Sequence, residues 1–261
     1  VAAGPLANFL LAILIFTFIF MFAGKDMTPA VIEEVQEDSP AFVSGLKKND
    51  QIISVNGKKI SSILEVSTFI STSSSKEIEI KVLRNDQIKS FSVVPKIIST
   101  KDSLGNTINK RIIGIRLSGP NKSFNHEKLP PSKAIFFSLK EVWFVTSTTL
   151  QYVKNIFVGS ADPEQLGGPI RIAKITGQVA EHGVLPFLSI MAYISISLGL
   201  INLFPIPMLD GGHLAFYAVE KVLGRPLKQK TQEGFFRIGL FLLFSLMFFA
   251  TFNDLKDIGI F

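Results

Sequence analysis

Asp210 is the residue whose surroundings in this sequence most clearly suggest chemistry. It follows an uncharged run over positions 183–209, and it comes just after Pro205 and Pro207 and just before two glycines. A carboxylate near hydrocarbon costs roughly 2.5–3.5 kcal/mol, so an acid in such a place is a candidate functional residue. Because prolines remove backbone donors and glycines allow turns, the pattern predicts a broken membrane helix that presents Asp210 to a cation, most simply a metal ion. The alternative is a helix that ends at the membrane surface, with Asp210 as a solvated cap.

A broken helix of this kind needs neighbouring spans to shelter it, and two other apolar segments can provide them. Residues 1–24 carry no charge, and the stretch 6–23 is long enough to cross roughly 30 Å of hydrocarbon. A signal peptide is the alternative, but the stretch lacks a basic start and a clear cleavage site. The last apolar run, 238–253, has marginal length and could also be a buried core helix. Transmembrane helices are therefore expected over 1–24, 185–212 and 236–254.

The composition of the 261 residues agrees with a membrane protein. Hydrophobic residues make up 47% of the chain and charged residues 18%, and the mean hydropathy is +0.38. The net charge of +6 could suggest a nucleic-acid partner, but the lysines and arginines are dispersed and not interleaved with exposed aromatics. Basic loops of a membrane protein explain the charge more simply, so we expect no nucleic acid. Because these residues include no cysteine, they cannot form a disulfide, a cysteine zinc site or a thiol nucleophile.

Residues 25–98 are predicted to form a soluble domain inserted between two spans. Alternating apolar and polar residues predict strands, and Asn56-Gly57 is a strong signal for a tight turn. A short helix over 61–70 would place Val66 and Ile70 on one side. The segment therefore predicts a compact sheet with one or two helices, with strands expected over 31–35, 52–55, 77–82 and 88–94.

Three other segments connect these parts. Residues 99–132 are predicted to be a polar linker, in which 111–117 could add a strand to the sheet. Residues 133–184 are predicted to form an amphipathic helix and a loop. The helix, over 133–157, could lie in the membrane interface with Trp143 as an anchor, or it could pack against the soluble domain. Residues 213–235 are predicted to be a basic loop, which the positive-inside tendency places in the cytoplasm, with the soluble domain on the opposite side.

The chain resembles the site-2 protease family of intramembrane zinc metalloproteases, in particular its bacterial regulator-of-sigma-E type. Residues 202–213 match the motif Asn-x-x-Pro-x-Pro-x-Leu-Asp-Gly-Gly-His, and residues 3–8 are similar to the motif Ala-Gly-Pro-x-Ala-Asn. Residues 39–57 resemble the PDZ pattern Ser-Pro-Ala…Gly-Leu…Gly-Asp-x-Ile-x-x-Val-Asn-Gly. Asn49 stands where that pattern has glycine, and asparagine tolerates a left-handed backbone. The order of parts also resembles the family.

The resemblance implies a polytopic α-helical membrane protein with an inserted PDZ-like α+β domain. It implies an intramembrane zinc metallopeptidase that cleaves transmembrane segments of substrate proteins in regulated intramembrane proteolysis. In this family Asp210 would bind Zn2+, and Asn202, Pro205 and Pro207 would be substrate-binding. Two zinc-binding histidines and the catalytic glutamate lie upstream in a His-Glu-x-x-His motif. The histidines here do not form that motif, so we expect a fragment without catalytic residues that is inactive alone; they are His126, His182 and His213.

The resemblance also implies partners and a location. The partners would be a membrane-spanning protein substrate, the lipid bilayer and a peptide tail at the PDZ-like domain, since PDZ domains add an extended peptide to a sheet edge. The location would be the bacterial inner membrane, with several spans and an extracytoplasmic PDZ-like domain. A non-catalytic membrane-tethered adaptor that binds peptide tails is the main alternative. A transporter is another, because broken helices with buried acids serve ion paths, but the few spans and the insertion argue against it.

Overall fold

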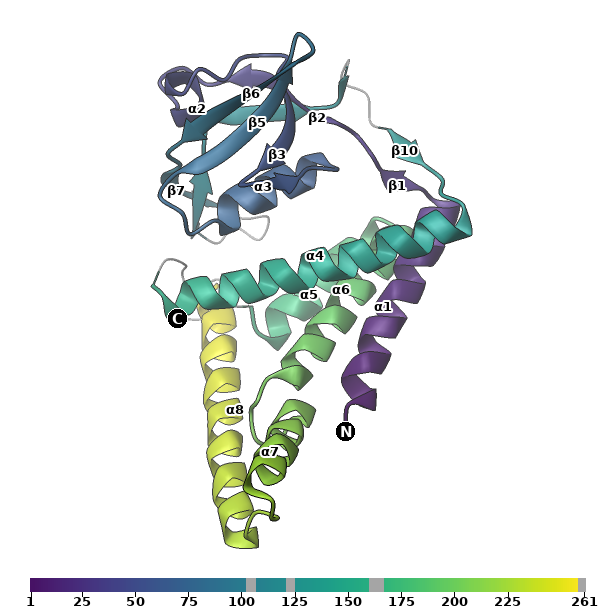
Figure 1. Cartoon of the computed structure of the whole chain (residues 1–261), viewed down its shortest axis with the longest axis vertical. Coiled ribbons are helices and arrows are strands. Elements are labelled where there is room, and N and C mark those ends of the chain that lie inside the picture. Colours follow the sequence, from purple (N-terminus) through teal and green to yellow (C-terminus); the bar gives the residue numbers. More distant parts are fainter. Residues whose placement is uncertain (102–106, 121–124, 160–166, 258–261) are drawn as a thin grey trace. The chain divides into compact units, whose positions relative to one another are not determined.

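A computed structural model describes residues 1–101, 107–120, 125–159 and 167–257, which form two compact units. The helical unit comprises Val1–Phe22, Pro130–Thr146 and Pro163–Phe261. The α/β unit comprises Ala23–Leu129 and Ser147–Asp162. Figure 1 shows the elements of each.

The helical unit is built from long apolar helices and three shorter or amphipathic ones. Among the described residues, α1, α6 and α8 are long and apolar enough to cross a membrane. The helices are α1 (Ala3–Phe22), α4 (Pro131–Phe157), α5 (Pro169–Glu181), α6 (Val184–Leu203), α7 (Asp210–Leu223) and α8 (Gln229–Asp257). The last residues of α4, from Ser147 on, belong to the α/β unit.

Helices α1 and α6 pack closely because small residues lie between them. A Cβ atom on Gly199 of α6 would lie 3.1 Å from the main-chain oxygen of Pro5. The Ser195 hydroxyl donates a 2.8 Å hydrogen bond to the main-chain oxygen of Asn8. Small residues and hydroxyl groups at a membrane helix interface allow backbones to approach and to bond in this way. The Phe16 and Tyr193 rings, 5.3 Å apart between centroids, continue the same contact.

The α/β unit contains an antiparallel sheet with the strand order β6-β5-β3-β2-β9, and β4 pairs with β3. The strands alternate as predicted: Ile78, Ile80 and Val82 of β5 are buried in the core, whereas Glu79 is exposed. Two separate strand pairs, β1–β10 and β7–β8, complete the unit. The strands are β1 (Lys25–Asp26), β2 (Ala30–Val35), β3 (Gln51–Val55), β4 (Lys58–Lys59), β5 (Ile78–Arg84), β6 (Gln87–Val93), β7 (Lys96–Lys101), β8 (Thr107–Ile112), β9 (Ile115–Ser118) and β10 (His126–Glu127), and the helices are α2 (Pro40–Val43) and α3 (Ile63–Thr72).

Tight turns fix the register of this sheet where the sequence predicts them. Asn56 and Gly57 both have positive φ, of 48° and 75°, and join β3 to β4 in a two-residue turn. Asn49, which replaces the usual glycine of the PDZ pattern, has φ 69°, so asparagine does keep the left-handed turn there.

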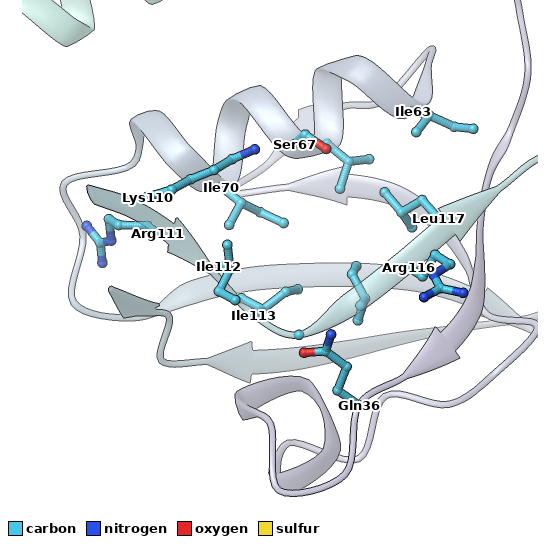
Figure 2. Close-up of a pocket in the computed structure, with 13 residues that line it drawn as sticks. Gln36, Ile63, Ser67, Ile70, Lys110, Arg111, Ile112, Ile113, Arg116 and Leu117 are labelled. Carbon is cyan, nitrogen blue, oxygen red and sulfur yellow. The ribbon is translucent and has the colours of Figure 1, made fainter. Parts of the chain in front are cut away.

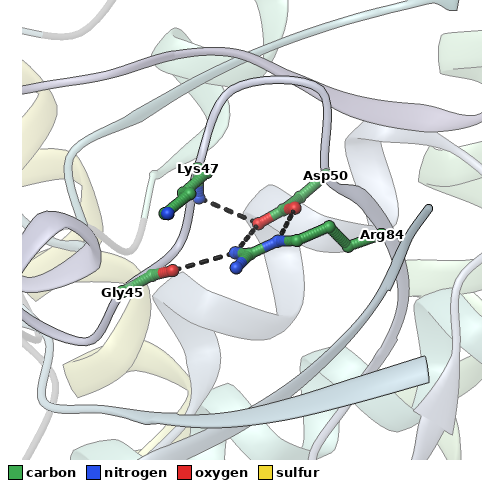
Figure 3. A network of polar contacts seen from close by, with 4 residues as sticks. All are labelled: Gly45, Lys47, Asp50 and Arg84. Carbon is green, nitrogen blue, oxygen red and sulfur yellow. Dashed lines mark hydrogen bonds and ion pairs between the residues drawn. The ribbon is translucent and has the colours of Figure 1, made fainter. Parts of the chain in front are cut away.

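An ion pair between the buried Asp50 and the partly exposed Arg84 fixes the loop before β3 (Figure 3). The side chain of Arg84 donates to both carboxylate oxygens of Asp50 at 2.6 Å and to the main-chain oxygen of Gly45 at 2.8 Å. The Lys47 main-chain N–H donates to the same carboxylate at 2.8 Å. The hydrogen bond with Asp50 raises the pKa of Arg84 above its ordinary value. The side chain of Asp50 is 1% exposed. Both of its carboxylate oxygens therefore accept hydrogen bonds from within the protein, from Arg84 and from the loop.

Replacing Asp50 with alanine is expected to destabilise the α/β unit by about 1–3 kcal/mol, because it removes the buried carboxylate that accepts hydrogen bonds from Arg84 and from the Lys47 N–H. The loss of unfolding free energy is measured on the full-length protein by urea unfolding, with limited proteolysis as the probe of the α/β unit. The control is Lys81→Gln, which breaks the exposed pair with Glu79 and should cost about 1 kcal/mol or less. Equal losses in the two variants would contradict the role of the pair between Asp50 and Arg84.

Several predicted boundaries are wrong, and local features explain the differences. The predicted strand over 111–117 is two strands, because Gly114 has φ 79° and its close approach to Ser39 leaves no room for a side chain. The predicted linker 99–132 therefore contains β8, β9 and β10. The predicted basic loop 213–235 instead contains most of α7 and the start of α8. Its charges concealed a helix whose end at Gly224, with φ 64°, is a common left-handed terminus.

Two further boundaries differ in the helical unit. The predicted loop after the amphipathic helix contains α5, where the β-branched residues and Gly177 weaken the helical pattern. The predicted span 185–212 ends as a helix at Leu203, and the predicted last span 236–254 begins at Gln229. The helix α4 itself matches the prediction, and Trp143 on it is 72% exposed.

Candidate metal site and peptide groove

The membrane-type helix α6 is broken directly before Asp210, as the prolines predict. Phe204 leaves the helix with ψ 142°, and Met208 has φ 89° between Pro207 and Leu209. A non-glycine residue with such a φ is strained, and strain of this kind persists only where the surrounding structure imposes it. Asp210 is then the first residue of α7, with Leu209 rather than Asp210 as its N-cap. The helix is therefore interrupted where the prolines predict, and Asp210 lies in the first turn of α7 and not at its N-cap.

Glycines allow the two helices to fold back onto the broken segment 204–209. A Cβ atom on Gly211 would overlap the main-chain oxygens of Leu203 and Phe204, and one on Gly212 would lie 2.8 Å from Pro207 Cα. Gly239 of α8 packs against the same segment, since its Cβ would lie 2.7 Å from the Pro207 side chain. The backbones of α7 and α8 therefore both pack directly against the backbone of this segment. These contacts set the direction in which Asp210 points.

The Asp210 carboxylate faces the start of α1. A Cβ atom on Gly4 would lie 2.8 Å from Asp210 Oδ2, so the glycine of the Ala-Gly-Pro motif makes room for the acid. Asp210 is half-buried, and no described residue hydrogen-bonds or ion-pairs with its side chain. The N-terminus of α7 favours a negative charge at this position. A carboxylate in this setting is an oxygen ligand without a partner, which suits a divalent cation.

The other predicted site residues lie on the two sides of the break. Asn202 is half-buried in the last turn of α6, and none of the described residues hydrogen-bonds its side chain. Pro205 is exposed and Pro207 is half-buried, and both belong to the non-helical segment. The structure therefore brings Asn202, Pro205 and Pro207 into the same short segment that leads to Asp210.

The described residues do not make up a complete zinc site. No group of three or more His, Cys, Asp or Glu side chains that could hold a metal lies within them. His213 contacts the Phe236 ring at 5.5 Å between centroids, His182 bonds its ring Nδ1 to the Gln178 oxygen at 2.8 Å, and His126 lies in β10. Asp210 fits the oxygen-ligand role, and a catalytic zinc takes three protein ligands.

The α/β unit has a groove that the sequence did not reveal, with a volume of about 340 Å³. Figure 2 shows its lining side chains, which come from α3 on one side and from the β8–β9 segment on the other. Among the described strands β9 pairs with β2 alone, and its residues Ile115, Arg116 and Leu117 line the groove. Apolar residues such as Ile70 and Leu117 line the groove together with cationic residues, which are Lys110, Arg111 and Arg116. In the sequence, the feature that could have indicated this groove is Gly114, which separates two strand-like segments.

The chain is similar to several known proteins. A protein from Agrobacterium fabrum, named as a candidate zinc metalloprotease, is 38% identical over 99% of this chain and 68% of its own length. The metalloprotease MmpA of Caulobacter vibrioides is 31% identical over 99% of this chain and 68% of its own length. A solved PDZ domain of an SdrC-like protein from Listeria monocytogenes covers 34% of this chain and 87% of its own, with 22% identity and a TM-score of 0.27.

The family itself is shown by a match over most of the sequence. The sequence model of peptidase family M50 matches residues 1–246, a range that contains both motifs and Asp210. The resemblance to site-2 proteases is thereby confirmed, and the names of the relatives support a metallopeptidase. This chain belongs to peptidase family M50.

Proposed function

We propose that this chain is the part of an intramembrane zinc metallopeptidase that carries Asp210, and that the enzyme cleaves membrane-spanning segments of other proteins. The observation that supports it most is the Asp210 carboxylate at the break between α6 and α7, directed toward Gly4 and without a partner among the described residues. A buried or membrane-embedded carboxylate that is not paired costs free energy unless a cation compensates it. Family membership supports zinc as that cation.

Each residue of the broken segment has a role in this proposal. Asp210 holds the zinc with ligands that lie outside the described residues. Zinc lowers the pKa of a bound water and polarises a carbonyl. The Asn202 side chain has both a donor and an acceptor, so it binds the backbone of a substrate segment held in extended form. Pro205 and Pro207 lack N–H groups, and they keep the segment non-helical so that an unwound substrate can lie beside it.

Zinc removal is the direct test of the proposed function. Full-length protein purified in detergent is treated with a chelator, and cleavage of a reporter with one membrane-spanning helix is measured. Cleavage is expected to fall to background and to return when zinc is restored, since the reaction depends on the metal. Cleavage that is unaffected by chelation, in protein shown to have lost its zinc, would overturn the proposal and favour a non-catalytic adaptor.

We further propose that the α/β unit is a PDZ-like domain that binds an extended peptide tail in the groove beside β9. The free edge of β9 can pair with a peptide strand, and Lys110 at the groove suits a terminal carboxylate. Arg111 already donates to main-chain oxygens of the loop after α3, and Arg116 pairs with Glu34, so neither is assigned to the carboxylate. The basic connection between α7 and α8 supports a cytoplasmic position for that turn, and an extracytoplasmic one for this domain in a bacterial inner membrane. The basic residues near the turn are Lys221, Arg225, Lys228 and Lys230.

Filling the groove tests the peptide proposal. Ser67 of α3 lines it, and Ser67→Phe is expected to weaken binding of peptides with free C-termini by about 10-fold or more, a change of about 1.4 kcal/mol. Fluorescence anisotropy with a peptide library measures the binding, and thermal unfolding checks the fold. The control is Lys48→Gln, at an exposed position outside the groove. If no peptide binds the unchanged protein, the domain acts as a spacer.

A further inference from the structure

The carboxylate of Asp254, near the end of α8, binds the start of α5. Asp254 Oδ1 accepts a 2.8 Å hydrogen bond from the Gly168 N–H, and Oδ2 accepts 3.0 Å hydrogen bonds from the N–H groups of Ile170 and Arg171. The first turn of a helix has free N–H groups, and Gly168, the N-cap of α5, has no side chain to satisfy them. Asp254 therefore caps α5 from another helix, and its residue is 1% exposed. We call these three bonds the Asp254 clasp.

The clasp also depends on a direct approach of the two backbones. A Cβ atom on Gly168 would lie 2.6 Å from Asp254 Oδ2 and 2.8 Å from the main-chain oxygen of Ala250. A side chain at position 168 would push α8 away from α5. The absence of a side chain at Gly168 thus makes room for the end of α8.

A second contact of α8, in its first half, is with the broken segment that precedes Asp210. Gly239 packs on Pro207, as described above, and lies about 22 Å from Asp254 along the helix at 1.5 Å per residue. Between these contacts the residues from Leu240 to Phe249 are mostly exposed. Among the described residues, α8 therefore contacts the rest of its unit in two places, near the clasp and near the broken segment. Between them it makes little contact.

The clasp closes a ring of elements. Helix α5 is joined to α6 by His182 and Gly183, α6 leads into the broken segment, α7 follows it, and α8 returns to α5 through Asp254. We propose that Asp254 is a positioning residue for the Asp210 site, acting through the contact of Gly239 with Pro207. Without the clasp, the end of α8 is released, its contact with Pro207 loosens, and the strained backbone at Met208 relaxes, so that the Asp210 carboxylate is no longer held in one direction. This inference rests on the proposed role of Asp210 as a zinc ligand.

The test compares Asp254→Asn with unchanged full-length protein, because asparagine keeps the size of the side chain but loses one acceptor and the charge. Hydrogen exchange followed by mass spectrometry is measured in peptides from residues 167–172 and 203–210. Exchange is expected to become faster in both peptides, and zinc affinity or kcat to fall about 10-fold or more, the range for groups that orient a metal ligand. KM is expected to change little, and Asp254→Glu, which keeps the carboxylate, should recover part of kcat. The control is Ser245→Ala, at an exposed position of α8.

The outcomes separate this inference from its alternatives. Faster exchange only in residues 167–172, with unchanged zinc affinity and kcat, would overturn it and leave Asp254 as a helix cap. Unchanged exchange in both peptides would overturn it as well. If Asp254→Asn does not insert in the membrane, Gly168→Ala opens the same contact from α5 and is judged by the same measurements. Zinc affinity that is insensitive to Asp210→Ala would instead refute the proposed function, and the exchange data would still report on the clasp.

Discussion

Asp210→Ala in the full-length protein is expected to reduce cleavage of a membrane-spanning reporter by at least about 100-fold, while the protein still inserts in the membrane. Loss of an orienting group near a metal already costs about 10–100-fold, and loss of a direct ligand should cost more. Removing the acid also removes a charge from the apolar surroundings of α6 and α7, so the fold is not expected to suffer. Cleavage is measured in membranes by the appearance of the shortened reporter, and bound zinc is measured in purified protein.

Two further variants show whether position or charge matters at this site. Gly4→Ala places a methyl group where Asp210 Oδ2 now approaches, so it should shift the carboxylate and cause a smaller loss than Asp210→Ala. Glu233→Gln removes an exposed acid from α8 and should leave cleavage unchanged. Normal cleavage and normal zinc content in Asp210→Ala would exclude this residue from the metal site.

Gly211→Ala is expected to abolish cleavage by displacing the broken segment. The added methyl group would overlap the main-chain oxygens of Leu203 and Phe204, which belong to the backbone and cannot rotate away. Overpacking of this kind typically costs about 1–3 kcal/mol and is relieved by backbone shifts. Because those shifts occur one residue from Asp210, loss of activity should exceed the loss of stability. Reporter cleavage and the thermal unfolding temperature, measured on the same preparations, compare the two.

Gly234→Ala is the matched control, since Gly234 also lies in a helix and a Cβ there would have no neighbour within 4 Å. Alanine at such a helical position is expected to be neutral or to stabilise by up to about 1 kcal/mol. A Gly211→Ala variant that cleaves as fast as Gly234→Ala would show that the close packing at the break is not required.

The sequence predicted the parts that depend on local pattern. Paired prolines before Asp210 indicated the broken helix, and the alternation through Ile78, Ile80 and Val82 indicated a half-buried strand. Asn56-Gly57 indicated a two-residue turn because both residues accept positive φ. Each of these signals is confined to a few neighbouring residues, and so each could be identified without knowledge of the fold.

Other features depend on residues that are far apart in the sequence, and the sequence did not reveal them. Asp254 and Gly168 are 86 positions apart, and nothing near either residue indicates that they meet. The main-chain oxygen of Asn8 accepts a hydrogen bond from the Ser195 hydroxyl, and no pattern near either residue predicts this pairing. The basic residues after Asp210 suggested a loop, because charge there concealed the apolar face of α7.

The pairing of α1 with α6 has a consequence for how the protein is made. The bond between Ser195 and Asn8 joins residues 187 positions apart, and the whole main segment of the α/β unit is encoded between them. At about 5–20 residues per second, roughly 10–40 s of synthesis separate the two helices. During that interval α1 exists without α6, so the main segment of the α/β unit is synthesised in full before the helices that support Asp210 can assemble.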